Sequence, residues 1–242
     1  MVQIYKTKTG ELFYLSFQKI ELMRVLFVAA TEFEVESLKS EVRRLKSESG
    51  DSDSRLRTND FRLLITGVGM VATAYALGRE LATNQYDLAI NLGIAGSFDR
   101  NIALGDVVEI TEDNLAELGA EDDEKFLPIA EMGFGKSAFG ATKPLEELVD
   151  LGLKKCSAVT VNTVHGNEAS IQKLQQRLKI QIESMEGAAF FYACSEAKVA
   201  CIQVRSVSNY VEKRNRDAWQ IGPAIKNLNE IAIKLLDALS IM

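Results

Sequence analysis

Short, uninterrupted apolar runs recur along the chain, and most of them stop where glycine or small polar residues begin. Continuous apolar runs of this length are typical of parallel strands that are buried on both faces. Segments with helical spacing of their apolar side chains separate the runs. The alternation predicts an α/β fold, a three-layer αβα sandwich with a mixed, mostly parallel central sheet, whose ligands bind at the carboxyl ends of the strands.

The individual elements follow from the same periodicity. The expected strands cover residues 24–30, 61–66, 87–92, 105–110, 156–164 and 199–205. The expected helices end near residue 44 or cover residues 70–83, 168–178, 188–197 and 222–239. Residues 47–60 are rich in Ser and Asp and predict a solvated connection. Residues 111–150 hold no long periodic segment, and a loop of this length is usually a lid or an interface.

Residues 1–22 lie outside this pattern, because the first core strand begins at Met23–Arg24. We expect residues 23–242 to form a single domain, which is an ordinary size for one α/β core. Residues 1–22 form an N-terminal extension, either an added hairpin or a non-native, over-extended start.

Composition excludes several classes of partner. The net charge is −6 and no block of Lys and Arg occurs, which argues against a nucleic-acid surface. No apolar stretch approaches the roughly 20 residues that a membrane helix needs. The opening residues are polar, without the apolar run that precedes a secretory cleavage site, so we expect a cytoplasmic protein.

The residues available for chemistry are restricted as well. His165 is the only histidine, and the three cysteines have no paired spacing, so neither a metal site nor a disulfide is expected. In Gly67-Val-Gly69 the third glycine of a dinucleotide-binding turn is replaced by Ala72, which that motif tolerates. However, no acidic residue stands at the end of the next strand, the first strand lacks the glycines, and no Walker lysine is present. We therefore expect no cofactor, and catalysis by carboxylates, amides and the backbone.

Taken together, the strand ends resemble the nucleoside phosphorylase and nucleosidase superfamily over roughly residues 23–242. The resemblance rests on six segments in order along the chain: Ala29-Ala-Thr-Glu-Phe-Glu-Val35, Thr66-Gly-Val-Gly69, Asn91-Leu-Gly-Ile-Ala-Gly96, Leu104-Gly-Asp-Val108, Glu183-Ser-Met-Glu-Gly187 and Val204-Arg-Ser-Val-Ser-Asn209. The last two are similar to the family's ribose-binding "VEMEG" and base-binding "VRAISD/N" segments. Ser184 departs from the family by replacing its usual Glu.

Glu34 has two interpretations. Thr31-x-x-Glu34 has the spacing of a capping box, which would make Glu34 a structural residue at a helix start. The resemblance implies instead that Glu34 activates water, as the nucleosidases do at this position. The phosphorylases carry a Gly-x-Pro-x-Arg phosphate loop here, whereas this loop holds Glu32, Glu34 and Glu36. Repulsion between like charges disfavours phosphate as the nucleophile, so hydrolysis is expected.

The resemblance also implies a ribose and base site. Glu186 would accept hydrogen bonds from the ribose hydroxyls, although an acidic residue also suits a helix N-terminus. Met185 would pack beneath the sugar, which is compatible with a role in core packing. Ile94, Ala95 and Gly96 would line the same site.

Asn209 bears on the choice of base. The adenine-specific nucleosidases place an Asp there, whereas an amide donates a hydrogen bond to N7 and orients toward a 6-oxo group. Asn209 therefore favours a 6-oxopurine such as hypoxanthine; alone, it would be interpreted as a turn residue after a strand.

Residues 210–219 and the Met185–Phe191 helix start resemble the futalosine hydrolases within this superfamily. Futalosine is an inosine-like nucleoside with a carboxyphenyl ketone on its 5′ side. Arg214 or Arg216 would bind the carboxylate and Trp219 the aryl ring, unless these residues form a solvated charged loop.

The resemblance thus implies an enzyme, an N-ribosyl hydrolase that cleaves futalosine to hypoxanthine and dehypoxanthine futalosine in menaquinone biosynthesis. Glu34, Glu186 and Asn209 would be catalytic, the partner a small purine nucleoside, and the assembly a homodimer or higher homo-oligomer. Two alternatives remain at this point: a methylthioadenosine/S-adenosylhomocysteine-type nucleosidase, and a catalytically silent nucleoside-binding protein.

Overall fold

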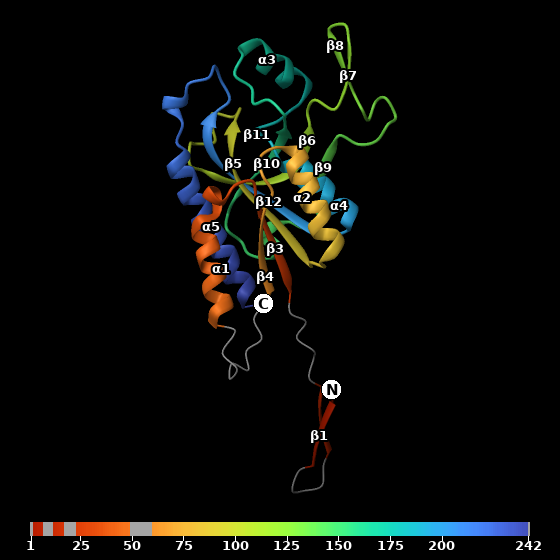
Figure 1. Cartoon of the computed structure of the whole chain (residues 1–242), viewed down its shortest axis with the longest axis vertical. Coiled ribbons are helices and arrows are strands. Elements are labelled where there is room, and N and C mark those ends of the chain that lie inside the picture. The colour runs from red at the N-terminus through yellow and green to blue at the C-terminus, as the bar shows by residue number, and fades with distance from the viewer. Residues whose placement is uncertain (1, 7–11, 17–22, 49–59, 242) are drawn as a thin grey trace.

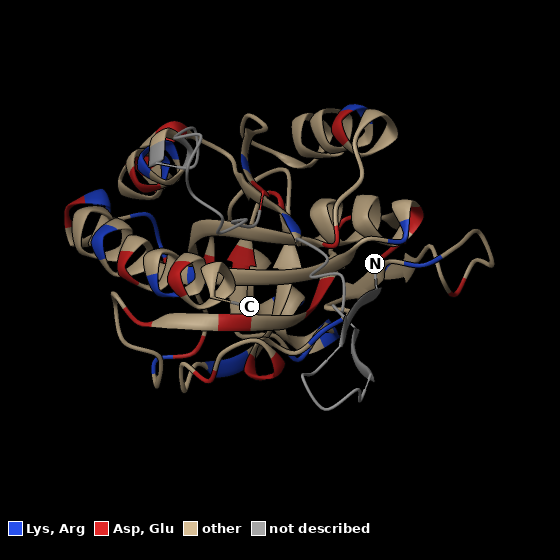
Figure 2. Ribbon diagram, turned by 90° about the horizontal axis from the view of Figure 1, so that it is seen from below, with Lys and Arg blue, Asp and Glu red and all other residues tan. Residues whose placement is uncertain are grey.

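The computed structural model describes residues 2–6, 12–16, 23–48 and 60–241. The connection expected at 47–60 falls largely outside the described residues. No helix in the described ranges is long and apolar enough to cross a membrane. Along the helices in Figure 2, basic and acidic residues alternate, so that the two signs of charge are mixed over the surface.

The central sheet is mixed and mostly parallel. Its strand order is β11-β10-β6-β12-β5-β3-β4, with β9 added beside β6. Within this order the β12–β6 pair is antiparallel, and the other neighbours are parallel. The strands are β3 (Arg24–Ala29), β4 (Asp60–Ile65), β5 (Leu88–Ser97), β6 (Val107–Leu115), β9 (Ala138–Gly140), β10 (Lys154–Thr160), β11 (Ile182–Ser184) and β12 (Ala200–Tyr210).

Helices cover both faces of the sheet, which makes the three expected layers (Figure 1). Helices α1 (Glu36–Glu48) and α5 (Ile221–Ser240) lie on one face, and α2 (Met70–Thr83) and α4 (Gly187–Ala197) lie on the other. Alternate residues of β3 belong to the two apolar cores, as the period of two in a strand requires. The predicted fold class is therefore confirmed.

Several strands differ from their expected bounds. β5 and β12 run on through the glycine and serine segments at their ends, to Ser97 and Tyr210, because the two strands pair with each other along this stretch. β11 was not expected at all, since a three-residue strand has no periodicity of its own and exists only through its neighbours. Residues 111–150 contain the end of β6, β9 and the hairpin β7 (Gly119–Asp122) and β8 (Lys125–Pro128). Long-range pairing has overridden local pattern at each of these places.

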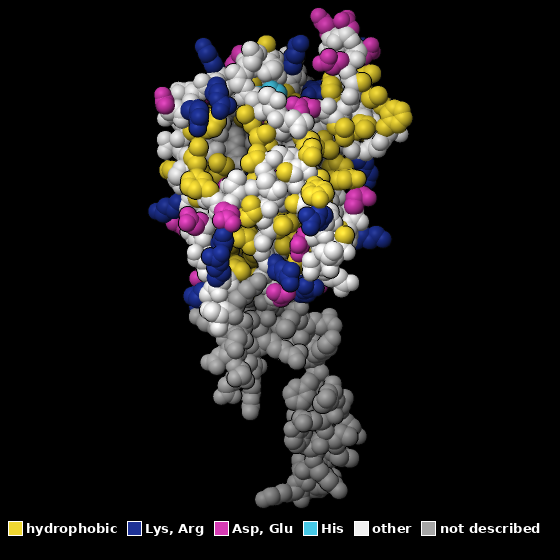
Figure 3. Space-filling model, in the orientation of Figure 1, with side chains coloured by type: hydrophobic (Ala, Val, Ile, Leu, Met, Phe, Trp, Pro, Cys, Tyr) yellow, Lys and Arg dark blue, Asp and Glu magenta, His cyan; other side chains and the backbone are white. Residues whose placement is uncertain are grey.

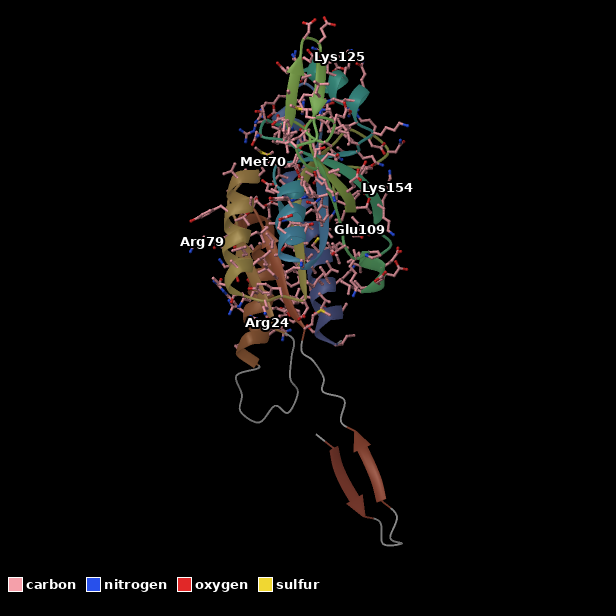
Figure 4. The ribbon with its side chains drawn as sticks, turned by 90° about the vertical axis from the view of Figure 1, so that its right-hand side faces the viewer. Arg24, Met70, Arg79, Glu109, Lys125 and Lys154 are labelled. Carbon is pink, nitrogen blue, oxygen red and sulfur yellow. The ribbon has the colours of Figure 1, made fainter. Side chains whose placement is uncertain are left out.

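Strand β11 shapes the region where ligands are expected. It pairs with β10 on one side and antiparallel to β5 on the other, with Ile182 opposite Ser97 and Glu183 opposite Gly96. The sheet thus closes upon itself at this end. In Figure 4 the label of Met70, at the start of α2, marks this end of the sheet, and the label of Arg24, at the start of β3, marks the opposite end. Among the described residues, the remaining α-helix is α3 (Glu168–Arg177), and the strands β1 (Val2–Lys6) and β2 (Leu12–Ser16) form a two-stranded sheet with each other. Within the same residues, three short 3₁₀ helices cover Glu32–Val35, Leu145–Glu147 and Arg216–Ala218.

Candidate active site

A cavity of about 290 Å³ opens where β3, β5, β11 and β12 end. We call its strand-end side the floor, formed by Glu34, Ile94, Gly96, Glu186 and Asn209, all of which line the cavity. We call its outer side the rim. It is formed by six residues of the loops that follow β10 and β12, namely Val164, His165, Glu212, Arg214, Asn215 and Trp219. This is the edge of the sheet that the strand alternation predicted.

Glu34 lies in a short 3₁₀ helix, Glu32–Val35, directly after β3 and is buried although it lines the cavity. Its Oε2 accepts hydrogen bonds from the backbone N–H of Thr31 at 2.9 Å and from the Thr31 hydroxyl at 3.0 Å. Its Oε1 accepts a third, from the N–H of Ile94 at 3.1 Å. The capping-box geometry and the position in the cavity are therefore both present, and the two interpretations of Glu34 are compatible.

The backbone at Glu34 is hydrogen-bonded to a residue of the C-terminal helix α5. The amide nitrogen of Asn229, on α5, donates to the Glu34 carbonyl at 2.9 Å, and its oxygen accepts from the N–H of Leu38 at 3.2 Å. Asn229 is buried, so these groups have little access to solvent. The position of the Glu34 carboxylate is thus fixed from three elements, β5, α5 and the 3₁₀ helix itself.

Glu186 stands at the N-cap position of α4, but its side chain does not cap that helix. Its Oε1 instead accepts from the N–H of Gly69, at the start of α2, at 3.0 Å. The carboxylate is buried and borders the cavity beside Met185. The carboxylate therefore bridges from the start of α4 to the start of α2.

Asn209 and Gly96 meet on the adjacent strands β12 and β5. A Cβ atom on Gly96 would lie 2.8 Å from Val211 Cγ2 and 3.2 Å from Asn209 Nδ2, so the close approach of these strands requires glycine. Asn209 Oδ1 accepts from the Ser208 hydroxyl at 2.9 Å, and its Nδ2 donates to the Tyr210 carbonyl at 3.0 Å. Ala95 also lines the cavity, and its carbonyl accepts from Ser208.

The rim residues are less firmly fixed. Arg214 and Trp219 line the cavity, and the Arg214 guanidinium lies 5.1 Å from the centre of the Trp219 ring. Arg216 stacks on the same ring at 6.0 Å but does not line the cavity. The structure thus brings the expected site residues together with the exception of Arg216, whose predicted contact with the substrate this placement does not support.

The cavity also contains a pair that the sequence did not indicate. Glu183 accepts a hydrogen bond from the His165 backbone N–H at 3.0 Å and pairs with His165 Nδ1 through its other oxygen. The hydrogen bond to Glu183 raises the pKa of His165 above its usual value, whereas burial opposes this shift. The two residues are eighteen positions apart, so no local pattern links them. The only indication was that Glu183 stands where the resembling segment has Val.

A buried polar network lies beneath the floor and was also missed. The Arg205 guanidinium donates to Gln203 Oε1 at 2.9 Å and to the side-chain oxygen of Asn91. A Cβ atom on Gly93 would lie 2.0 Å from Arg205 Nη1 and 3.2 Å from Glu34 Oε1, so both side chains converge on this glycine. The spacing of Gln203 and Arg205, two apart in an apolar strand, places them on one face and was an available clue.

Asp113 continues this network toward α4. Its two oxygens accept from the Thr160 hydroxyl at 2.9 Å and from Gln203 Nε2 at 3.0 Å, and Thr160 Oγ1 accepts from the N–H of Ala188 at 2.7 Å. Burial raises the pKa of Asp113 to about 6, although its hydrogen bonds lower it. The start of α4, which directly follows Glu186, is therefore tied to the strands under the floor.

Among the described residues, no three His, Cys, Asp or Glu side chains come together in a group that could hold a metal ion. The three cysteines are free and buried. What the cavity offers to a ligand is a set of carboxylates and amides on the floor, with basic and aromatic groups at the rim.

The sequence profile of the phosphorylase superfamily matches residues 24–240. This match spans the whole central sheet and every residue of the floor and rim. The chain therefore belongs to the phosphorylase superfamily.

Within it, three relatives at 30% to 34% identity are futalosine hydrolases, and the chain belongs with this family. It is 34% identical to the futalosine hydrolase of Streptomyces coelicolor over 185 residues, which cover 73% of this chain and 79% of that protein. It is 26% identical to the 5′-methylthioadenosine/S-adenosylhomocysteine nucleosidase of Colwellia psychrerythraea, over 90% of this chain and 97% of that one.

Solved structures share the fold. The futalosine hydrolase of Helicobacter pylori superposes with a TM-score of 0.69 at 14% identity, over 90% of this chain and 97% of that one. The adenine complex of the Colwellia psychrerythraea nucleosidase superposes with a TM-score of 0.70 at 22% identity, over 93% of this chain and 98% of that one. At these identities the superposition concerns the fold alone.

Proposed function

We propose that this protein hydrolyses the N-ribosidic bond of futalosine and releases hypoxanthine and dehypoxanthine futalosine on the route to menaquinone. The observation that best supports this is the floor itself, where two buried carboxylates, Glu34 and Glu186, border one cavity. Among the described residues, no Lys or Arg lines that side. An inorganic phosphate would face like charge there, whereas neutral water would not. The futalosine hydrolase relatives support the same reaction.

The floor residues divide the reaction between them. Glu34 accepts a proton from water, whose oxygen forms a bond to C1′ as the bond from C1′ to N9 breaks. The electron pair of the broken bond passes into the purine, which gains a proton from solvent as hypoxanthine is released, while Glu34 returns its proton to solvent. Glu186 accepts hydrogen bonds from the ribose hydroxyls, and its negative charge stabilises the positive charge that develops on the sugar. Met185 packs against the sugar.

Asn209 serves the departing base. Its amide donates to N7 as electron density enters the ring, and its neutral side chain tolerates a 6-oxo group. Because an amide has no proton to give up, it supplies a hydrogen bond rather than general acid catalysis. Ser208, which donates to Asn209 Oδ1, would keep the amide in the orientation that this contact needs.

We also propose that the protein works in the cytoplasm as a homo-oligomer. On the face of the molecule that Figure 3 shows, hydrophobic side chains gather over α2, whose place is labelled in Figure 1. Val68, Val71 and Tyr75 are 58%, 78% and 67% exposed, which is unusual for apolar residues this close together. Val68 also lines the cavity, so a second copy placed on this face would adjoin the active site. Light scattering should give a multiple of the chain mass, and Tyr75→Glu should give the monomer.

A methylthioadenosine/S-adenosylhomocysteine nucleosidase is the second candidate, because such proteins align over nine-tenths of the chain. A catalytically silent nucleoside-binding protein is the third candidate, and the two floor carboxylates count against it.

One assay separates the three candidates. The protein is incubated with futalosine, inosine and methylthioadenosine, with and without phosphate, and the released base is identified. We expect hypoxanthine from futalosine at a rate independent of phosphate. Adenine as the main product, phosphorolysis, or no release would overturn the proposal.

A further inference from the structure

We propose that His165 and Arg214 form an anion-binding subsite at the rim, which binds a carboxylate on the 5′ substituent of the substrate. His165 is held there by hydrogen bonds to the buried carboxylate of Glu183. The inference rests on the proposed function and deepens it, because it states which group of the substrate this enzyme recognises. It adds a residue, His165, to which no role has yet been given.

Glu183 fixes the imidazole in one orientation. The carboxylate is buried on β11, between β10 and β5, and is therefore carried by paired strands on both sides. One oxygen holds the His165 backbone N–H and the other holds Nδ1. The remaining ring nitrogen, Nε2, has no hydrogen-bond partner in the part of the chain that the structure describes, and the side chain lines the cavity. The ring thus presents Nε2 as a free donor.

The loop that carries Arg214 meets the loop that carries His165. A Cβ atom on Gly166, the residue after His165, would lie 3.6 Å from Arg214 Cβ, so the two rim loops touch at this point. Among the residues that line the cavity, His165 and Arg214 are the basic ones. Arg214 forms no ion pair with any described residue; its guanidinium lies over Trp219.

The local charge balance favours an anion at the rim. Glu212 also lines the cavity, but it pairs with Arg100, and Glu183 pairs with His165. These two carboxylates are thereby neutralised, which leaves the charge of Arg214 uncompensated. A substrate carboxylate placed between Arg214 and Nε2 of His165 would accept charge-assisted hydrogen bonds from both, whereas the neutral methylthio group would gain neither.

The charges around His165 favour its protonated form. Glu183 raises the pKa of the ring by hydrogen bonding and by charge, and Glu117 raises it further. Burial and the positive charge of Arg177, on α3, lower it. The net direction is upward, so the imidazolium is more populated near pH 7 than that of a free histidine.

The position of Glu183 sets this chain apart from the segment that it resembles. Where that segment reads Val-Glu-Met-Glu-Gly, this chain reads Glu-Ser-Met-Glu-Gly. Neighbouring residues of a strand point to opposite sides, so moving the carboxylate by one position moves it to the other side of β11. Here that side faces His165. Ser184, at the vacated position, accepts a hydrogen bond from the N–H of Gly187 instead.

The test compares futalosine with its methyl ester, which lacks the negative charge and keeps the rest of the molecule. We expect the wild-type protein to prefer the acid in kcat/KM. His165→Gln and Arg214→Gln should each reduce the ratio of acid to ester by about 10-fold, the usual effect of one charge-assisted hydrogen bond. Lys213→Gln is the matched control, because Lys213 is an exposed cation next to Arg214 that does not line the cavity, and its ratio should not change.

The pH dependence separates a binding role from a structural one. The preference for the acid should fall as pH rises through the pKa of His165, and Glu183→Gln should move that fall to lower pH, with melting curves confirming that each variant is folded. Equal losses on acid and ester, or an unchanged ratio, would overturn the subsite while leaving the proposed function intact. If the wild-type protein cleaves neither compound, the proposed function fails. Calorimetric binding of benzoate, lost in His165→Gln and absent for methyl benzoate, would then still decide the subsite.

Discussion

The floor and the rim of the cavity are built differently. On the floor, Glu34 and Glu186 are buried, and each accepts a backbone N–H from an element far away in sequence, Ile94 and Gly69 respectively. At the rim, Arg214 is exposed and is held by stacking on Trp219. Only His165, through Glu183, brings the rigidity of a strand to the rim.

This difference separates chemistry from selection. Groups that must meet a transition state have to be held closely in place, and backbone hydrogen bonds across the sheet do that. Groups that recognise a variable substituent are better placed on loops, which tolerate change without disturbing the sheet. Floor substitutions should therefore change turnover on every substrate, whereas rim substitutions should change the choice among substrates.

The largest effect is expected on the floor. Glu34→Gln should lower kcat by at least about 100-fold, the range for loss of a general base, on futalosine and on inosine alike. The fold should persist, because one oxygen remains to accept a hydrogen bond from Ile94 or from Thr31. Steady-state kinetics and a melting curve measure the two properties together.

Thr31→Val is the matched control for Glu34. It removes the hydroxyl that donates to Glu34 Oε2 and keeps the backbone donor. We expect it to cost about 1 kcal/mol of stability, as lost caps do, with most of the turnover retained. If Glu34→Gln behaves in the same way, with lower stability and normal turnover, Glu34 is a capping residue and the floor is not catalytic in the proposed sense.

The next effect tests how far the floor depends on the network below it. The pKa of Asp113 is raised to about 6 in the folded chain, above its ordinary value, so its protonated form is the one that folding favours. The corresponding stability is present below about pH 4 and is lost as pH rises through 6. Relative to Asp113→Asn, which does not titrate there, the wild-type protein should lose on the order of 3 kcal/mol between pH 4 and pH 7. Urea unfolding at several pH values measures this, and a flat difference would contradict it.

Much of the floor was predictable because it is local in the sequence. Glu34, Ile94 and Asn209 follow apolar runs in the sequence. Because the carboxyl ends of parallel strands meet at one edge of the sheet, these three floor residues were expected to converge. Their roles still came from the resemblance, since Thr31-x-x-Glu34 alone indicates only a cap. The structure adds that the same carboxylate satisfies the cap and borders the cavity.

The parts that could not be predicted depend on long-range contacts. Asp113, Gln203 and Arg205 are joined by side-chain hydrogen bonds between β6 and β12, and nothing in a single strand reveals its partner. The pair of His165 and Glu183 exists because three residues of β11 fit between two other strands. β11 was missed for the same reason, because its three residues form a strand only through these neighbours.

A smaller effect is expected for the base. Asn209→Asp should impair release of hypoxanthine, because a carboxylate repels a 6-oxo group and would also face the Tyr210 carbonyl that Nδ2 now contacts. The same change should improve cleavage of adenine nucleosides by about 10-fold, the value of one well-placed hydrogen bond in the transition state. Measurement of kcat/KM for inosine and adenosine with both proteins decides it. An unchanged preference would mean that other residues select the base and that Asn209 does not determine specificity.

The smallest effect is expected for deletion of residues 1–22, which tests whether residues 23–242 supply both floor and rim. β1 and β2 pair with each other and with no strand of the central sheet among the described residues. The anchor of β3 begins after them: Asp60 donates its N–H to the Met23 carbonyl at 3.1 Å, and the Arg24 N–H donates to Asp87 at 2.7 Å. We therefore expect the shortened chain to keep its melting temperature and to keep kcat/KM within roughly two-fold, as is usual when a terminus makes few contacts with the core. Deletion through residue 26 is the contrasting variant. It removes both anchors and half of β3, and it should abolish soluble expression. If the shorter deletion is already insoluble or inactive, residues 1–22 belong to the domain. The rigidity of the floor would then depend on these residues as well as on the central strands.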